Sequence, residues 1–237
     1  MIEMIQLAVF DMSGTTIKDN NEVLDCFYDA LIETGIPREK SDIKTMMGWS
    51  KIEVFRTLWT QEMGIYTEGV EQKAQHSFTV FKKYLEHYYN THNIEPTKGC
   101  LDIFNYLKEK QIKIALNTGF YRKVTDVLLK KLSWSMGNTF DFSITSDEVA
   151  KGRPKPDMIN ALMQHFNLKK PENVFKIGDT PSDLMEGRAA KCWTFGVTNG
   201  THKHHELFLY DNDGLFDSLE TFLAFLKAKE WSESTYI

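Results

Sequence analysis

Short apolar runs alternate with helical repeats along most of this chain. The runs span four to seven residues between polar or turn-forming segments, which is typical of buried strands. They lie at residues 5–10, 112–117, 142–145, 173–179 and 193–197. Between the later runs, apolar residues recur at the period of an amphipathic helix, at residues 100–111, 124–132, 158–166 and 182–190. Strands separated by helices predict a Rossmann-like α/β fold with a parallel sheet.

Residues 18–95 show a different pattern, with successive helical repeats and no strand-like run. The repeats cover residues 22–35, 50–64 and 70–93. We therefore predict an all-helical cap domain at 18–95, inserted into an α/β core formed by 1–17 and 96–237. The connections fall near 16–19 and 94–99, where Pro96 and Gly99 favour a hinge.

Composition narrows the class of protein. Of 237 residues, 42% are hydrophobic, which is enough for a sizeable core. The net charge of −5 comes from mixed signs without a basic stripe, so we expect no nucleic-acid partner. No apolar run reaches membrane-spanning length, and the N-terminal residues do not resemble a secretory signal, so we expect no membrane partner either. The cysteines follow no disulfide or metal spacing, which favours a reducing, cytoplasmic location; they are Cys26, Cys100 and Cys192.

Polar residues stand at the ends of four predicted strands. Singly, an Asp after a strand is usually a turn or helix-capping residue. The carboxyl ends of parallel strands, however, meet at one edge of a sheet, where ligands bind. A candidate site therefore forms from Asp11, Thr118, Gly119, Arg153, Asp179 and Asp183.

These residue types suit phosphoryl transfer. Asp11 can attack phosphorus as a carboxylate nucleophile. Because a phosphoryl dianion repels that carboxylate, a cation must bridge the two, and Mg²⁺ prefers oxygen ligands. We expect these from Asp11, Asp179 and the backbone carbonyl of Ser13, with Asp183 as a direct or outer ligand.

The remaining strand-end residues can hold the substrate. Arg153 can neutralise phosphoryl charge and position Asp11. Thr118 and the backbone amides beside it can bind phosphoryl oxygens, and Gly119 lets the backbone approach closely.

The motifs "DMSGT", "NTG", "GRPKPD" and "GDTPSD" follow one another in the order found in the haloacid dehalogenase superfamily of aspartyl-phosphate hydrolases, which the chain resembles over nearly its full length. The resemblance implies a Rossmann-like core, a mobile helical cap and Mg²⁺ as cofactor. In most phosphatases of this superfamily, a second acid stands two residues after the nucleophile and protonates the leaving group. Here that position is Ser13. Either the leaving group needs no proton, another group supplies it, or the enzyme is slow or inactive.

Lys51 offers a reason for the missing acid. Ser50 is predicted to cap a helix that starts at Lys51, with Glu53 completing a capping box. The positive end of the helix dipole lowers the pKa of an ammonium there, and a neutral amine can form a Schiff base with a carbonyl substrate. Such an imine accepts the electrons released when a C–P bond breaks. The alternative is an ordinary solvated surface lysine.

The chain also resembles the phosphonatase, or phosphonoacetaldehyde hydrolase, branch of that superfamily. The resemblance rests on the small residue Ser13, on Arg153 where other branches have Lys, and on the Met-Gly-x-x-Lys pattern of Met47, Gly48 and Lys51. It implies that Ser13 and Gly48 contact the substrate, and that two copies pair through the cap helices.

Two positions depart from that branch, which has His three residues after the lysine and Tyr after Thr-Gly. Here they are Val54 and Phe120. We therefore expect a Mg²⁺-dependent, phosphonatase-like hydrolase acting on a small phosphonate aldehyde or ketone. Two alternatives stay open: a phosphatase of small phosphate monoesters such as phosphoglycolate, and a phospho-ligand binding protein without turnover.

Overall fold

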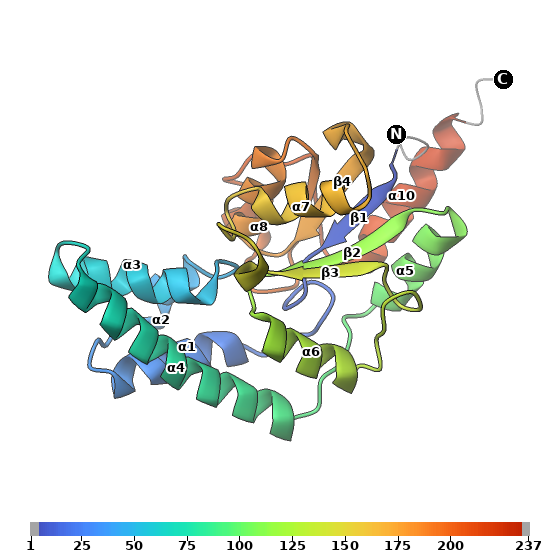
Figure 1. Ribbon diagram of the computed structural model, residues 1–237. Helices are drawn as coiled ribbons and strands as arrows, with labels where there is room; N and C mark the ends of the chain where they lie inside the picture. Colours follow the sequence, from blue (N-terminus) through green and yellow to red (C-terminus); the bar gives the residue numbers. More distant parts are fainter. Residues whose placement is uncertain (1–4, 234–237) are drawn as a thin grey trace.

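The computed structural model describes residues 5–233 and contains a six-stranded parallel sheet (Figure 1). The strand order is β3-β2-β1-β4-β5-β6. The strands are β1 Leu7–Phe10, β2 Lys113–Thr118, β3 Phe142–Thr145, β4 Val174–Gly178, β5 Trp193–Val197 and β6 Gly214–Phe216. The parallel α/β fold class and five of these strands are confirmed. Strand β6 was not predicted, because its three half-buried residues form no apolar run.

The central strand β1 carries the two faces of the core in alternation. Phe10 points to one face, where its ring packs edge-on against Phe104 in helix α5 (Cys100–Glu109) and Phe175 of β4. Val9 belongs to the cluster on the opposite face, which includes Met158 in helix α7 (Asp157–His165). The helices that follow the insertion are α5 Cys100–Glu109, α6 Arg122–Lys131, α7 Asp157–His165, α8 Pro181–Ala189, α9 His204–Leu207 and α10 Leu219–Glu233, with 3₁₀ turns at Ser146–Glu148 and Pro171–Asn173.

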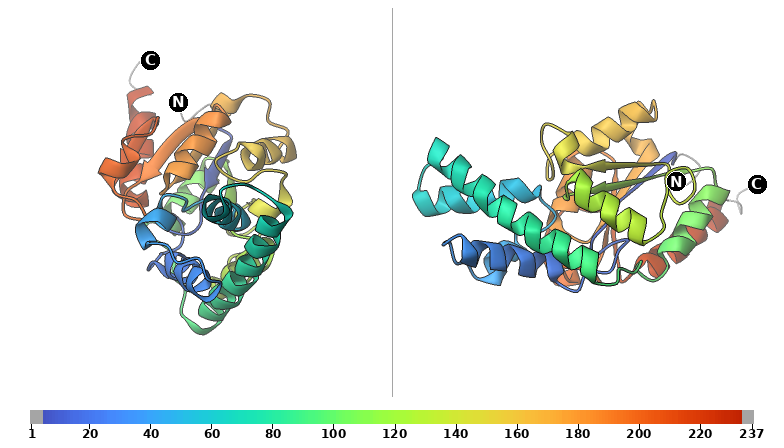
Figure 2. Two further views of the ribbon diagram at one scale, coloured as in Figure 1. Left: turned by 90° about the vertical axis from the view of Figure 1, so that its left-hand side faces the viewer. Right: turned by 60° about the horizontal axis from the view of Figure 1, so that its bottom comes forward.

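Four helices stand between β1 and α5: α1 Glu22–Glu33, α2 Lys40–Lys44, α3 Lys51–Met63 and α4 Glu68–Thr91. We call residues 22–91 the helical insertion; Figures 1 and 2 show it grouped to one side of the sheet. Its centre is aromatic, with the ring of Phe27 stacked on Phe81 at 4.3 Å and tilted against Phe55 at 5.2 Å. The insertion therefore has apolar packing of its own.

The two connections to the insertion run side by side. Ile17 and Pro96 form an antiparallel bridge, and the Lys18 amide donates to the Glu95 carbonyl at 3.0 Å. These contacts lie where the hinge was predicted. The division of the chain into a core and a mobile cap domain stays a prediction.

Among residues 5–233, no helix has both the length and the apolar character needed to cross a bilayer. All three cysteines are free thiols and buried. The cytoplasmic location stays a prediction.

Candidate active site

Asp11 lies directly after β1, at the carboxyl edge of the sheet, and is 4% exposed. Nη2 of Arg153 donates to Oδ1 of Asp11 at 2.6 Å and to the Asn117 backbone carbonyl at 2.7 Å. The arginine is thus fixed between the ends of β1 and β2. It leaves one carboxylate oxygen of Asp11 free of that bond.

Asp179 and Asp183 follow β4, the other neighbour of β1. Each of the three aspartates offers an oxygen, and these oxygens all lie within 4.8 Å of one another. Asp179 accepts from the Thr15 hydroxyl at 2.9 Å and from the Thr201 amide at 2.7 Å. The structure therefore brings together the carboxylates that the sequence placed on separate strands.

The two aspartates after β4 differ in their electrostatic surroundings. Asp183 lies 2.7 Å from Arg153 and 2.8 Å from Lys176. Burial is the largest single influence on the pKa of Asp183, and it favours the neutral acid. The charges of Arg153 and Lys176 together outweigh burial, so the pKa of Asp183 is lowered. Asp179 has no cationic partner among residues 5–233, so burial, and then the charges of Asp11 and Asp183, raise its pKa to about 8.

This arrangement suits a hard cation. Within residues 5–233, Asp179 is fully buried without a cationic side chain to balance its negative charge, and the one ion pair of Asp11 is with Arg153. An all-oxygen donor set of this kind is what Mg²⁺ prefers. Asp183 already forms ion pairs with Arg153 and Lys176 and accepts from the Thr180 hydroxyl, so it is better placed to orient the others than to ligate directly.

Lys51 is the first residue of α3 and is 5% exposed. Its Nζ lies 5.6 Å from the ring centre of Phe27 and 5.0 Å from that of Phe120. Burial, and then the positive charge of Arg153, lower the pKa of Lys51 to about 8. The lowered pKa was predicted, but burial, rather than the helix dipole, is its largest cause.

The predicted capping box at the start of α3 is wrong. Ser50 does occupy the N-cap position, but its side chain makes no capping hydrogen bond. Glu53 instead accepts from Arg56 at 2.5 Å, because one turn along the helix a guanidinium offers a stronger partner than a backbone amide.

A small cavity of about 20 Å³ joins the two halves of the site. Of the nine site residues predicted from sequence, Asp179 and Asp183 are not part of its lining. The other seven line it: Asp11, Ser13, Gly48, Lys51, Thr118, Gly119 and Arg153. Their catalytic and substrate-binding roles stay predictions, and their convergence on one cavity agrees with those roles.

The loop before α3 closes directly over the strand ends. Gly48 has φ +86°, and a Cβ there would lie 2.4 Å from the Thr180 hydroxyl oxygen. At Gly119, a Cβ would lie 2.5 Å from the Trp49 carbonyl oxygen. Both positions therefore exclude larger residues, and the helical insertion is seated tightly on the core.

Several residues of the site were not predicted. Asp19, in the connection to α1, lines the small cavity and accepts from the Ser13 hydroxyl at 3.2 Å. Lys176 could have been identified, since a charged residue inside the buried strand β4 requires a partner. For Asp19 the sequence held no such signal, because only the folding of the connection brings it to the cavity.

Lys51→Met should stabilise the protein near neutral pH. The folded-state pKa of about 8 lies below the ordinary value of 10.5, so below pH 8 the folded state carries the full cost of the buried ammonium, on the order of 3 kcal/mol. That cost falls as the pH rises from 8 to 10.5. Urea unfolding should show Lys51→Met to be more stable than the wild type at pH 7, with a smaller difference at pH 10. A less stable variant at both pH values would contradict the assigned burial of the amine.

The geometry suits a hydrolase that uses a strand-end carboxylate, and comparison with known proteins supports hydrolase activity. The sequence pattern of the haloacid dehalogenase-like hydrolases matches residues 8–197, and the chain belongs to this family of enzymes. Among curated relatives, it is 31% identical over 204 residues to a phosphonoacetaldehyde hydrolase of Latilactobacillus sakei subsp. sakei, covering 81% of this chain and 75% of the relative.

Solved structures share the fold. A phosphonoacetaldehyde hydrolase-like protein from Oleispira antarctica superimposes with a TM-score of 0.75 at 20% identity, covering 93% of this chain and 91% of the other. A putative phosphoglycolate phosphatase from Lactobacillus delbrueckii subsp. bulgaricus gives 0.72 at 22% identity, with 92% and 96% covered. The resemblance to this hydrolase superfamily and to its phosphonatase branch is confirmed, and the reading as a non-catalytic binding protein is not supported.

Proposed function

We propose that this hydrolase cleaves the C–P bond of a phosphonate aldehyde or ketone, using an imine at Lys51 and an aspartyl-phosphate at Asp11. One observation carries the proposal: a buried lysine with a pKa of about 8 lines the same small cavity as the strand-end carboxylate. A solvated surface lysine would have neither property. Burial of an amine without an acidic partner is costly, which supports a chemical role.

In the proposed reaction, the amine of Lys51 condenses with the substrate carbonyl and releases water. Asp11 then attacks phosphorus, the C–P bond breaks, and its electron pair moves into the protonated imine to give an enamine. The enamine takes up a proton on carbon, and water releases the carbonyl product and the free lysine. A second water hydrolyses the aspartyl-phosphate. Since one water is released and two are consumed, the net reaction is hydrolysis to phosphate and the dephosphonylated carbonyl compound.

The other strand-end groups support this chemistry. Arg153 contacts Asp11 and can hold phosphoryl oxygens as negative charge shifts between them. Asp11, Asp179 and the Ser13 carbonyl would hold Mg²⁺, with Asp183 orienting them. A bound Mg²⁺ supplies the positive charge that lets one anion approach another.

Two side chains at the lysine differ from those of the phosphonatase branch. Phe120, beside the Lys51 amine, has no hydroxyl, and Val54 is buried and apolar. Neither can move protons around the imine. Ser13 and Asp19 are polar groups on the same cavity that remain for this task. The substrate therefore need not be phosphonoacetaldehyde. Pairing of two copies through the insertion helices stays a prediction.

A phosphatase of small phosphate monoesters is the second candidate, and Asp19 is the observation in its favour. This carboxylate lines the cavity with Asp11 and could serve where the second acid of the superfamily is absent. A turnover screen with Mg²⁺ should compare 2-oxoalkylphosphonates with phosphate esters such as phosphoglycolate. Phosphonate turnover supports the proposal, and ester turnover alone favours the second candidate.

Ser13→Asp separates the two functions further. In a phosphatase, the added acid should raise ester hydrolysis by roughly 10²–10⁴-fold. In a phosphonatase, phosphonate turnover should fall, because the new carboxylate would face Asp19, now 3.2 Å from the Ser13 hydroxyl. Steady-state rates on both substrate classes provide the measurement, with Ser13→Ala as the matched control. A rise in ester hydrolysis with no phosphonate activity in either form would refute the phosphonatase proposal.

Metal removal should silence the enzyme. Dialysis against a chelator should abolish turnover and Mg²⁺ should restore it, because the unneutralised carboxylates otherwise repel the phosphonate. Mg²⁺ should also raise the melting temperature of the wild type more than that of Asp179→Asn, which provides a readout without substrate. Full activity in excess chelator would contradict the metal assignment.

A further inference from the structure

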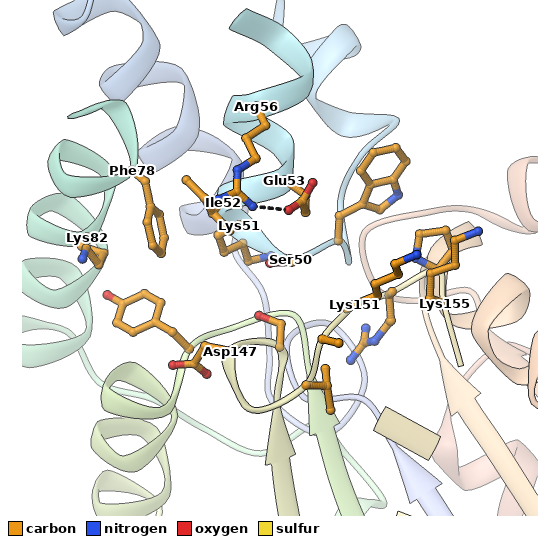
Figure 3. Close-up of a pocket in the computed structure, with 18 residues that line it drawn as sticks. Ser50, Lys51, Ile52, Glu53, Arg56, Phe78, Lys82, Asp147, Lys151 and Lys155 are labelled. Atoms are coloured by element: carbon orange, nitrogen blue, oxygen red, sulfur yellow. Dashed lines mark hydrogen bonds and ion pairs between the residues drawn. The ribbon is translucent and has the colours of Figure 1, made fainter. Parts of the chain in front are cut away.

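A second and much larger cavity lies on the other side of Lys51. Its volume is about 810 Å³, against about 20 Å³ for the small cavity that Asp11 lines. Lys51 and Arg153 line both cavities. Figure 3 shows the larger one between α3, α4 and the segment that follows β3. Phosphonoacetaldehyde has seven non-hydrogen atoms, and its carbonyl carbon carries only hydrogen on the side away from the phosphonate, so it would leave this space unused.

The walls of the large cavity are mostly apolar. The rings of Phe78 and Tyr121 meet edge-on with their centres 5.7 Å apart, and Ile52 of α3 lines the cavity with them. Pro154, next to Arg153, adds apolar surface from the core side. Such walls suit a hydrocarbon or aromatic segment, which gains free energy by leaving water.

The rim of this cavity is cationic. Lys82 stands on one side, with Lys151 and Lys155 on the other (Figure 3). In the described part of the chain, none of these three lysines forms an ion pair. The negative charge of the lining comes from two carboxylates, Glu53 and Asp147.

Both carboxylates of the lining are already engaged. Glu53 accepts from Arg56 at 2.5 Å, and Asp147 accepts from the Thr145 hydroxyl at 2.6 Å and the Arg122 amide at 3.1 Å. Arg56 balances the charge of Glu53, and Asp147 is a single carboxylate against three lysines, so the rim keeps an excess of positive charge, which attracts an anionic ligand.

We propose that the substrate is a 2-oxoalkylphosphonate whose alkyl group is apolar and ends in a carboxylate. This inference rests on the proposed function. With the carbonyl carbon at Lys51, which lines both cavities, the phosphonate arm points toward Asp11. The second substituent of that carbon, which is only hydrogen in an aldehyde, extends into the large cavity. Its carboxylate then meets Lys151 and Lys155.

The test compares two substrates that differ in one charge: a 2-oxoalkylphosphonate ending in a carboxylate, and its methyl ester. Each solvent-accessible charge pair contributes up to about a factor of five, so two lysines predict a kcat/KM on the order of tenfold higher for the acid, and at most about 25-fold. The double variant Lys151→Gln/Lys155→Gln should abolish this preference. Lys130→Gln, an exposed lysine on α6 outside the cavity, is the matched control and should retain it.

Binding to the Asp11→Asn variant, measured by calorimetry, provides a second readout that does not depend on turnover. The acid should bind more tightly than the ester, and the preference should vanish when the two lysine changes are added. If the wild type cleaves phosphonates but shows equal kcat/KM and equal affinity for the acid and the ester, the inference about the substrate is overturned and the proposed function stands. No cleavage of any phosphonate would overturn the proposed function and this inference with it.

Discussion

Asp11→Asn should reduce turnover by at least roughly 10⁴-fold on any substrate, because an amide cannot form the acyl phosphate that a carboxylate forms. The side chain keeps nearly the same shape, and its neighbour Arg153 keeps Asp183 at 2.7 Å and Glu186 at 3.3 Å. The fold should therefore survive the change. Steady-state rates, with unfolding curves on the same samples, provide the measurement.

Asp102→Asn is the matched control, since it makes the same chemical change at an exposed position of α5 away from the site. It should retain the wild-type rate. A folded Asp11→Asn protein with a rate near that of the wild type would remove Asp11 from the mechanism.

Lys51→Arg should lose nearly all phosphonate turnover, by roughly 10³-fold or more. Arginine keeps the positive charge but does not form the imine, so the electrons of the breaking C–P bond have no acceptor. In a phosphatase, by contrast, the retained charge should leave kcat largely intact and mainly raise KM. Separate determination of kcat and KM on both substrate classes distinguishes these cases.

Lys83→Arg makes the same substitution at an exposed position of α4 and should leave kcat and KM unchanged. A Lys51→Arg enzyme that turns over phosphonates at the control rate would exclude an imine at this lysine.

The sheet could be predicted because its strands are almost fully buried. Residues of β1 and β4 are buried throughout, so their apolar runs contrast with the flanking segments. Since parallel strands end at one edge, Asp11 and Asp179 could be brought together from sequence order alone. Short or half-buried elements carry no such contrast, which is why β6 and the five-residue helix α2 were missed.

The two cavities could not be predicted, because they depend on how the helical insertion sits on the core. The close approach of Gly48 and Gly119 fixes that position, and it arises from contacts between segments about seventy residues apart in sequence. The same packing buries Lys51, which the sequence could identify only as the first residue of a helix. Local helix geometry predicted the right direction for the pKa of Lys51, whereas the tertiary contacts supply most of the shift.

Borohydride trapping tests the proposed imine most directly. The wild-type enzyme is mixed with a 2-oxoalkylphosphonate, reduced, digested with trypsin and analysed by mass spectrometry. A reduced adduct on Lys51 would block cleavage there, so a modified peptide covering residues 45–56 should appear. Its yield should rise as the pH increases through about 8, where the amine loses its proton. No adduct from a substrate that the enzyme demonstrably cleaves would contradict the Schiff-base mechanism.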